Sequence, residues 1–122
     1  MLKVSEYYLK EEYDKILNLD ESIRFVGRIK NRNVVAFVRR KDFEPLIDEE
    51  MGNLAHYQAL VKANMEEIFD SQLGKTNWMI TCKELVKMIT LFLDDELLIL
   101  SIDGAGNHDQ VIQKIQRLNT KF

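Results

Sequence analysis

Three short apolar runs follow one another between Asn77 and Asp103, and they constrain the fold more than any other feature of the chain. They read TNWMITCKE, VKMITLFLDD and ELLILSID, and each is about as long as an ordinary β-strand. Only turn residues separate them, at 83–85 and 94–95, so no helix can connect parallel strands here. The sequence therefore predicts an antiparallel three-stranded meander.

The middle run is apolar on both of its faces. Its side chains alternate between two apolar sets, one of Val86, Met88 and Phe92 and the other of Ile89, Leu91 and Leu93. A strand of this kind belongs to a sheet that is covered on both sides, by helices or by another chain.

A hairpin is expected upstream of the meander. Residues Ile23–Ile29 alternate in polarity, and Asn33–Arg39 reads NVVAFVR. The connection Lys30-Asn31-Arg32-Asn33 suits a tight turn because asparagine tolerates positive φ.

Helical periodicity appears in three further segments. We expect helices over Val4–Leu19, over Glu49–Gln72 and from a cap at Asn107 to Leu118, with Asp48 as an N-cap and Gly74 as a terminator. No repeat or linker interrupts the chain. The sequence thus predicts a single α+β domain over residues 1–122. Its expected architecture is a five-stranded antiparallel sheet with helices on its faces, in the order α-β-β-α-β-β-β-α.

The long central helix carries more apolar surface than one sheet requires. Tyr57 and Leu60 widen its apolar face toward Asn64. We expect this helix to contact more than its own sheet. The rest of that face consists of Met51, Leu54, Val61, Met65, Ile68 and Phe69.

Composition excludes several classes of protein. The chain has 122 residues, one cysteine (Cys82) and a net charge of −3, which together favour a cytoplasmic protein without an intramolecular disulfide. No apolar stretch is long enough to cross a bilayer, and the net charge gives no general attraction to nucleic acid. We expect no membrane insertion and no nucleic-acid partner.

One segment is strongly basic. Residues 23–41 hold seven arginines and lysines and no carboxylate, and Arg24, Arg28, Lys30 and Arg32 follow the first strand to its tip. These four residues form a candidate docking patch for an acidic or phosphate-bearing partner. The alternative is solubilising charge on an exposed strand.

No grouping of residues matches a catalytic or metal-binding pattern. His56 and His108 lack a second ligand at helical spacing, and Cys82 has no adjacent base. The segment Asp103–Asp109 holds two glycines before a helix, but it lacks the complete phosphate-binding and calcium-binding patterns. We therefore predict no catalytic residues, no metal, no cofactor and no enzymatic activity.

The order of elements resembles the roadblock/LC7 family, a profilin-like fold, over nearly the whole chain from Val4 to Leu118. It is also similar to short archaeal proteins with the same basic hairpin, long helix and meander ending in LDDELLILSID. The resemblance implies a regulatory or scaffold module that acts by protein–protein interaction as a homodimer, with small GTPases among the expected partners. Carried onto this chain, the implied dimer interface is Tyr57, Leu60, Asn64, Trp78 and Met79.

A second hypothesis stays open, because profilin-like folds also resemble small-molecule sensor domains of the PAS type. That function needs a pocket between the sheet and a helix. The large side chains of Trp78, Met88 and Phe92 are expected to fill such a space.

Overall fold

The computed structural model describes residues 13–41 and 43–118. Its elements are the strands and helices β1 (Ile23–Lys30), β2 (Asn33–Arg39), α2 (Glu49–Glu66), η1 (Glu67–Phe69), α3 (Asp70–Leu73), β3 (Trp78–Cys82), β4 (Val86–Leu93), β5 (Glu96–Asp103) and α4 (His108–Leu118). Residues 13–17 are also helical, and the first part of the predicted helix Val4–Leu19 lies outside the described residues.

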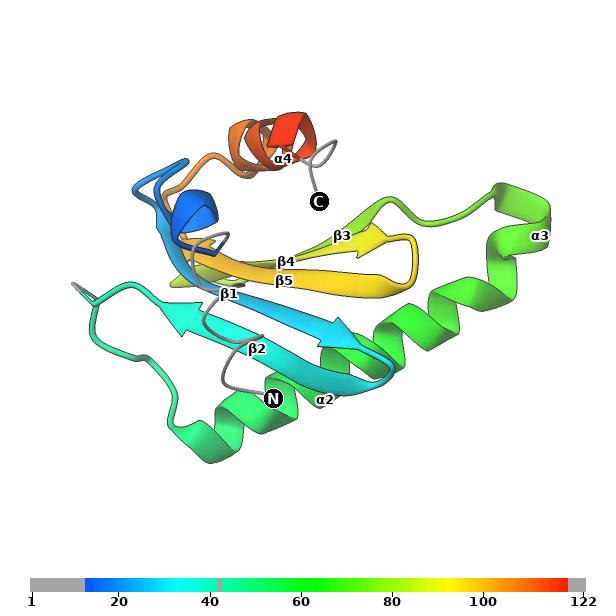
Figure 1. The fold of residues 1–122 in the computed structure, drawn as a ribbon, viewed down its shortest axis with the longest axis horizontal. Helices are drawn as coiled ribbons and strands as arrows, with labels where there is room; N and C mark the ends of the chain where they lie inside the picture. The colour runs from blue at the N-terminus through cyan, green and yellow to red at the C-terminus, as the bar shows by residue number, and fades with distance from the viewer. Residues whose placement is uncertain (1–12, 42, 119–122) are drawn as a thin grey trace.

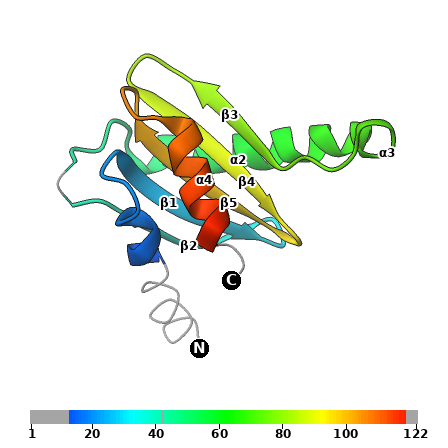
Figure 2. The same ribbon diagram turned by 90° about the horizontal axis from the view of Figure 1, so that it is seen from above.

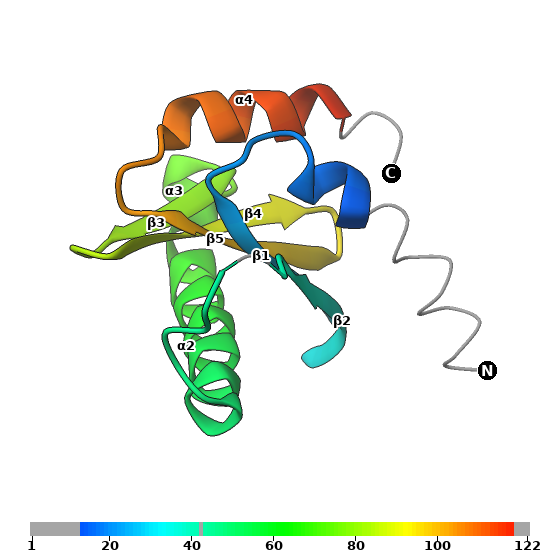
Figure 3. The same cartoon turned by 90° about the vertical axis from the view of Figure 1, so that its left-hand side faces the viewer.

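The strands form one sheet in the order β2-β1-β5-β4-β3, and every neighbouring pair is antiparallel. Figure 1 shows α2 on one face of this sheet and α4 on the other. The view along another axis in Figure 3 places the helical residues 13–17 on the same face as α4. The predicted antiparallel sheet with helices on its faces is confirmed.

The meander follows from local chemistry. Turns at 83–85 and 94–95 separate β3, β4 and β5, at the positions predicted from the sequence. The β1–β2 hairpin closes through two residues with positive φ, Asn31 (51°) and Arg32 (67°). Asparagine was expected in that conformation, but Arg32 was not. The turn requires positive φ at both central residues to match the strand twist, so Arg32 adopts it without a favourable side chain.

The main core lies between the sheet and α4. Ile89, Leu100 and Ile102 of the sheet are fully buried there against the apolar face of α4, together with Ile16 from the first helix. Asn107 begins α4 as predicted, because its Oδ1 accepts a hydrogen bond from the Gln110 amide at 3.1 Å. Figure 2 shows α4 crossing this face of the sheet.

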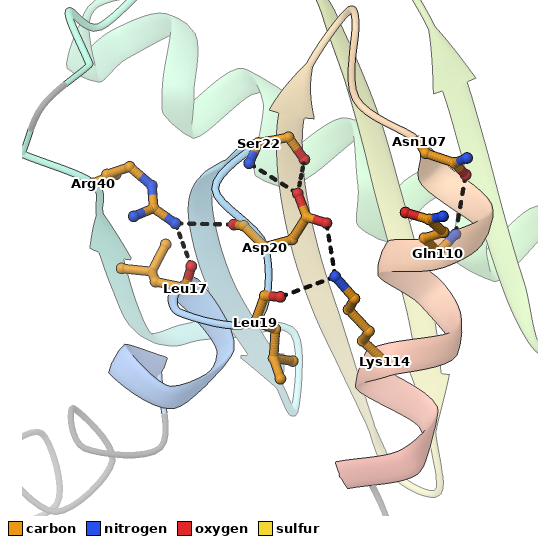
Figure 4. A network of polar contacts seen from close by, with 8 residues as sticks. All are labelled: Leu17, Leu19, Asp20, Ser22, Arg40, Asn107, Gln110 and Lys114. Atoms are coloured by element: carbon orange, nitrogen blue, oxygen red, sulfur yellow. Dashed lines mark hydrogen bonds and ion pairs between the residues drawn. The ribbon is translucent and has the colours of Figure 1, made fainter.

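A polar network fixes the first helix to the sheet and to α4 (Figure 4). The guanidinium of Arg40 donates to the backbone carbonyls of Leu17, Asp20 and Ile23. The Asp20 carboxylate accepts from Ser22 through its amide and its hydroxyl, and it forms an ion pair of 3.1 Å with Lys114 of α4. Two segments 94 residues apart are thereby joined.

The long central helix is interrupted near its end. Asp48 caps α2 as predicted, with its carboxylate accepting from the Met51 amide at 2.8 Å. The helix then tightens to a 3₁₀ turn at η1 before α3 ends at Gly74, whose φ is 89°. Figures 1 and 2 show that η1 and α3 extend beyond the sheet. No helix among the described residues is long and apolar enough to cross a membrane.

Candidate functional site

The face of α2 that lies against the sheet is lined by small residues. Gly52 and Ala63 are the buried residues of this helix, and Ala55 and Ala59 are half-buried between them. Their spacing of three to four residues places them on one side of a helix. Small side chains let the helix backbone approach the strands closely, but they bury little apolar surface.

The large apolar side chains of α2 point away from the sheet. We call five of them the outer stripe, because their spacing of three and four residues aligns them along one side of the helix. Each is exposed, by 37% to 70%. The outer stripe consists of Leu54, Tyr57, Val61, Met65 and Ile68.

This orientation leaves apolar surface that the helix does not bury on its own sheet, and the expectation that the helix contacts something more stays a prediction. A row of exposed apolar side chains of this length is unusual on the surface of a monomer and is typical of an interaction site. The predicted interface residues Tyr57 and Asn64 are exposed, whereas Leu60 is half-buried against Ile29 and Leu97.

The other two predicted interface residues lie on β3, which is an edge strand of the sheet. Trp78 is 39% exposed and Met79 is half-buried. An edge strand has unpaired backbone donors and acceptors along one side, so it can add a strand from another chain. The outer stripe and the β3 edge are therefore two separate surfaces that one partner could engage.

A cavity of about 640 Å³ lies between α2, from Met51 to Lys62, the sheet and the loop after β2, and residues of all five strands contribute to its lining. Its floor is apolar, with Met79, Met88 and Ile99 from the sheet. The expectation that Trp78, Met88 and Phe92 would fill this space is wrong. Met88 lines the cavity without filling it, Trp78 stands on the edge strand, and Phe92 packs in the small core under the other end of α2. The small residues of α2 leave the space open.

His56 of α2 packs against β1 at one end of this cavity. Its ring lies 5.4 Å from the Phe25 ring, centroid to centroid. Both ring nitrogens are buried, and neither makes a hydrogen bond to the described residues. Burial lowers the pKa of His56, and the positive charge of Arg39 lowers it further, while the backbone carbonyl of Gly52 acts in the opposite direction.

The four residues of the predicted basic patch have different environments. Arg24 donates to the Glu44 carbonyl at 2.8 Å and lies over the Phe43 ring, and Arg28 forms an ion pair of 2.6 Å with Glu96. Lys30 is half-exposed and Arg32 is exposed at the turn. Only Lys30 and Arg32 have no ion pair or side-chain hydrogen bond among the described residues.

No group of three or more His, Cys, Asp or Glu side chains within residues 13–41 and 43–118 could hold a metal ion. Cys82 is a free, exposed thiol at the end of β3.

Sequence comparison finds no relative: no family model and no curated protein matches the chain. Comparison with solved structures does find similar proteins. An MglB structure with a tetrameric arrangement superimposes with a TM-score of 0.69 at 14% identity, covering 91% of this chain and 82% of its own. A roadblock/LC7 domain from Streptomyces avermitilis gives 0.69 at 5% identity and covers 87% of both chains. The chain has the roadblock/LC7 fold. The gliding protein MglB from Thermus thermophilus gives 0.66 at 14% identity, covering 88% of this chain and 79% of its own.

The outer stripe and the β3 edge belong to the long helix and to the strand that follows it in the chain. The outer stripe is exposed although the helix is interrupted at η1, and Trp78 on the β3 edge is exposed as well. The described residues of the first helix contact the α4 side of the sheet through Tyr13, Ile16 and Leu17 and do not cover either of these two surfaces. The sequence left open whether that helix or a second subunit covers the sheet. Within the described residues, the first helix covers the α4 side only.

Proposed function

We propose that this protein is a non-enzymatic regulatory or scaffold module that pairs with a second copy of itself through α2 and the β3 edge. The observation that carries the proposal is the outer stripe. Full burial of an exposed aliphatic side chain contributes about 1.5 to 3 kcal/mol, and Leu54 and Ile68 are still 57% and 70% exposed, so a second helix lying on the stripe would gain a large part of this at each position.

The geometry supports a two-fold symmetric pair. In such a pair the same surface on each copy contacts its equivalent, so one apolar stripe meets another. An edge strand from each copy can also join the two sheets. Tyr57, Asn64, Trp78 and Met79 would then lie in the interface, with Leu60 behind it.

The test is the mass of the protein in solution by sedimentation velocity at micromolar concentration. We expect a dimer for the wild type and a monomer for Met65→Lys, which places a charge within the outer stripe. The control is Leu85→Lys, because Leu85 is 67% exposed in the β3–β4 turn and belongs neither to the outer stripe nor to β3. A wild-type monomer, or a Met65→Lys protein that is still dimeric, contradicts the proposal.

We further propose a small GTPase as the partner of the dimer, on the basis of the resemblance to the roadblock/LC7 family. Lys30 and Arg32 are the residues of the basic patch that are free to contact it. The experiment measures binding of purified small GTPases from the same organism, and their GTP hydrolysis rates, with wild-type protein and with Arg32→Glu. Absence of binding by every GTPase tested contradicts this partner and leaves the dimer proposal unaffected.

A further inference from the structure

The cavity between α2, the sheet and the loop after β2 has an apolar interior and a cationic lining. Among the described residues, five cationic side chains contribute to its walls and one carboxylate, Glu44. Arg24 and Arg40 among the cations are held by backbone carbonyls. The other three have no ion pair among the described residues, and they are Arg39, Lys62 and Lys83.

Lys62 is placed inside this wall rather than in solvent. It lies on α2 one residue before the buried Ala63 and is itself half-buried. Its Nζ donates to Oγ1 of Thr81 on β3 at 3.2 Å. An ammonium group has three donors, so two remain available to an anion in the cavity. A half-buried ammonium without a carboxylate favours an anionic ligand, because the pairing is screened less there than on the surface.

The floor of the cavity suits a flexible chain. Met79 and Met88 contribute polarisable side chains that adapt to irregular shapes, and Val86 and Ile99 add aliphatic surface beside them. The volume of about 640 Å³ falls within the ordinary range for small-molecule sites, which are mostly apolar with a few polar groups that orient the ligand. A ligand that matches both features has an apolar body and one negative group.

We propose that this cavity binds a single-chain amphiphile with a carboxylate headgroup, of the fatty-acid class. The chain lies along Met79, Met88 and Ile99, and the carboxylate pairs with Lys62. The proposal rests on the sheet-facing side of α2 and not on the pairing of outer stripes, although Leu54 and Tyr57 of the outer stripe also line the cavity.

Isothermal titration calorimetry with laurate below its micelle concentration tests the proposal. We expect saturable binding of one laurate per chain, and binding at least about tenfold weaker for dodecyltrimethylammonium, which has the same chain length and the opposite charge. The absence of saturable laurate binding overturns the proposal, and so does equal affinity for the two compounds.

Three variants locate the site. Lys62→Gln should weaken laurate binding about tenfold, the effect of losing one charged hydrogen bond. Lys15→Gln is the matched control, because Lys15 is exposed in the first helix, on the opposite face of the sheet. Ile68→Lys should leave laurate affinity unchanged, since Ile68 belongs to the outer stripe and does not line the cavity. Loss of binding in Ile68→Lys, or unchanged affinity in Lys62→Gln, contradicts the assignment.

A cavity-filling variant separates this inference from the proposed dimer. Ala59→Leu places a larger side chain at the cavity wall, and leucine is compatible with the helix because its helix propensity is high. This variant should abolish laurate binding without changing the mass of the protein in solution. If a second copy of α2 occupies the cavity instead, laurate does not bind and Ala59→Leu shifts the mass toward the monomer. That result overturns the amphiphile site and supports the dimer. Laurate binding to a wild-type protein that is monomeric supports the amphiphile site and contradicts the proposed dimer.

Discussion

The imidazole of His56 on α2 lies directly on the backbone of Gly27 on β1. A Cβ atom at Gly27 would stand 3.3 Å from Nε2 of His56 and 3.0 Å from the ring of Phe25. The absence of a side chain at Gly27 is therefore what allows the first half of α2 to pack against this strand.

Gly27→Val should destabilise the fold by about 1 to 3 kcal/mol, the usual cost of overpacking a close contact. Valine favours strands, so an increase in stability would be expected if the site had room. A double-mutant cycle with His56→Ala isolates the contact, and we expect the two changes to couple by more than about 0.5 kcal/mol. The measurement is urea unfolding of the four proteins. Additive effects would show that His56 does not limit the space at Gly27.

His56 should make stability dependent on pH below neutrality. Its pKa in the folded protein is lowered, chiefly by burial, so the unfolded chain binds the proton more readily. The contribution of neutral His56 to the unfolding free energy is therefore complete above the pKa that histidine has in the unfolded chain, about 6.5. It is lost as the pH falls toward the lower pKa that His56 has in the folded protein. We expect the unfolding free energy of the wild type to decrease from pH 7 to pH 5.

The variant His56→Leu should flatten that dependence, because leucine does not titrate. His108→Gln is the control, since His108 is the other histidine and lies at the start of α4, on the opposite side of the sheet. Equal pH profiles for wild type and His56→Leu, measured by urea unfolding at each pH, would rule out His56 as the titrating group.

Local chemistry explains why the strands and helix caps could be predicted. The turns at 83–85 and 94–95, the Asp48 cap and the termination of the central helix at Gly74 depend on neighbouring residues only, and the structure confirms them. The break at η1 was not predicted, because residues 67–69 carry no helix-breaking residue.

The orientation of α2 could not be predicted, because the helix is apolar on most sides. The large residues were expected to form the apolar face of the helix, but in the structure that face points to solvent. The signal for the sheet-facing side was the recurrence of Gly52, Ala55, Ala59 and Ala63, which marks close packing of a helix backbone. The cavity depends on the same choice of small residues, together with the distance of α2 from β3, which is a tertiary property.

Asp20 should stabilise the protein at neutral pH and not in acid. Its pKa is lowered, first by the hydrogen bonds from the Ser22 hydroxyl and amide and then by Lys114. The stabilisation is present above the unfolded pKa of about 3.9 and is lost as pH falls through the folded value. Asp20→Asn should cost about 1 kcal/mol at pH 7, as expected for a partly exposed, hydrogen-bonded carboxylate.

The difference between wild type and Asp20→Asn should then shrink as the pH falls below about 4. Asp14→Asn is a suitable control, because Asp14 is exposed in the first helix and forms no ion pair among the described residues. Thermal unfolding at pH 7 and at pH 3 provides the comparison. A difference that is the same at both values would show that the carboxylate charge is not the cause.

Arg40 should be a structural residue rather than part of a docking surface, although the sequence places it within the basic segment. Its guanidinium donates to three backbone carbonyls, of Leu17, Asp20 and Ile23, and so closes the end of the first helix against β1. Lysine keeps the charge but cannot present the planar set of donors that reaches all three carbonyls.

We expect Arg40→Lys to lower the unfolding free energy by about 1 to 3 kcal/mol. Arg39→Lys, at an exposed neighbour, should change it by less than about 0.5 kcal/mol. Because the first helix packs on the α4 side of the sheet, Arg40→Lys should leave the mass in solution unchanged, and a shift of that mass would connect Arg40 to the interface instead.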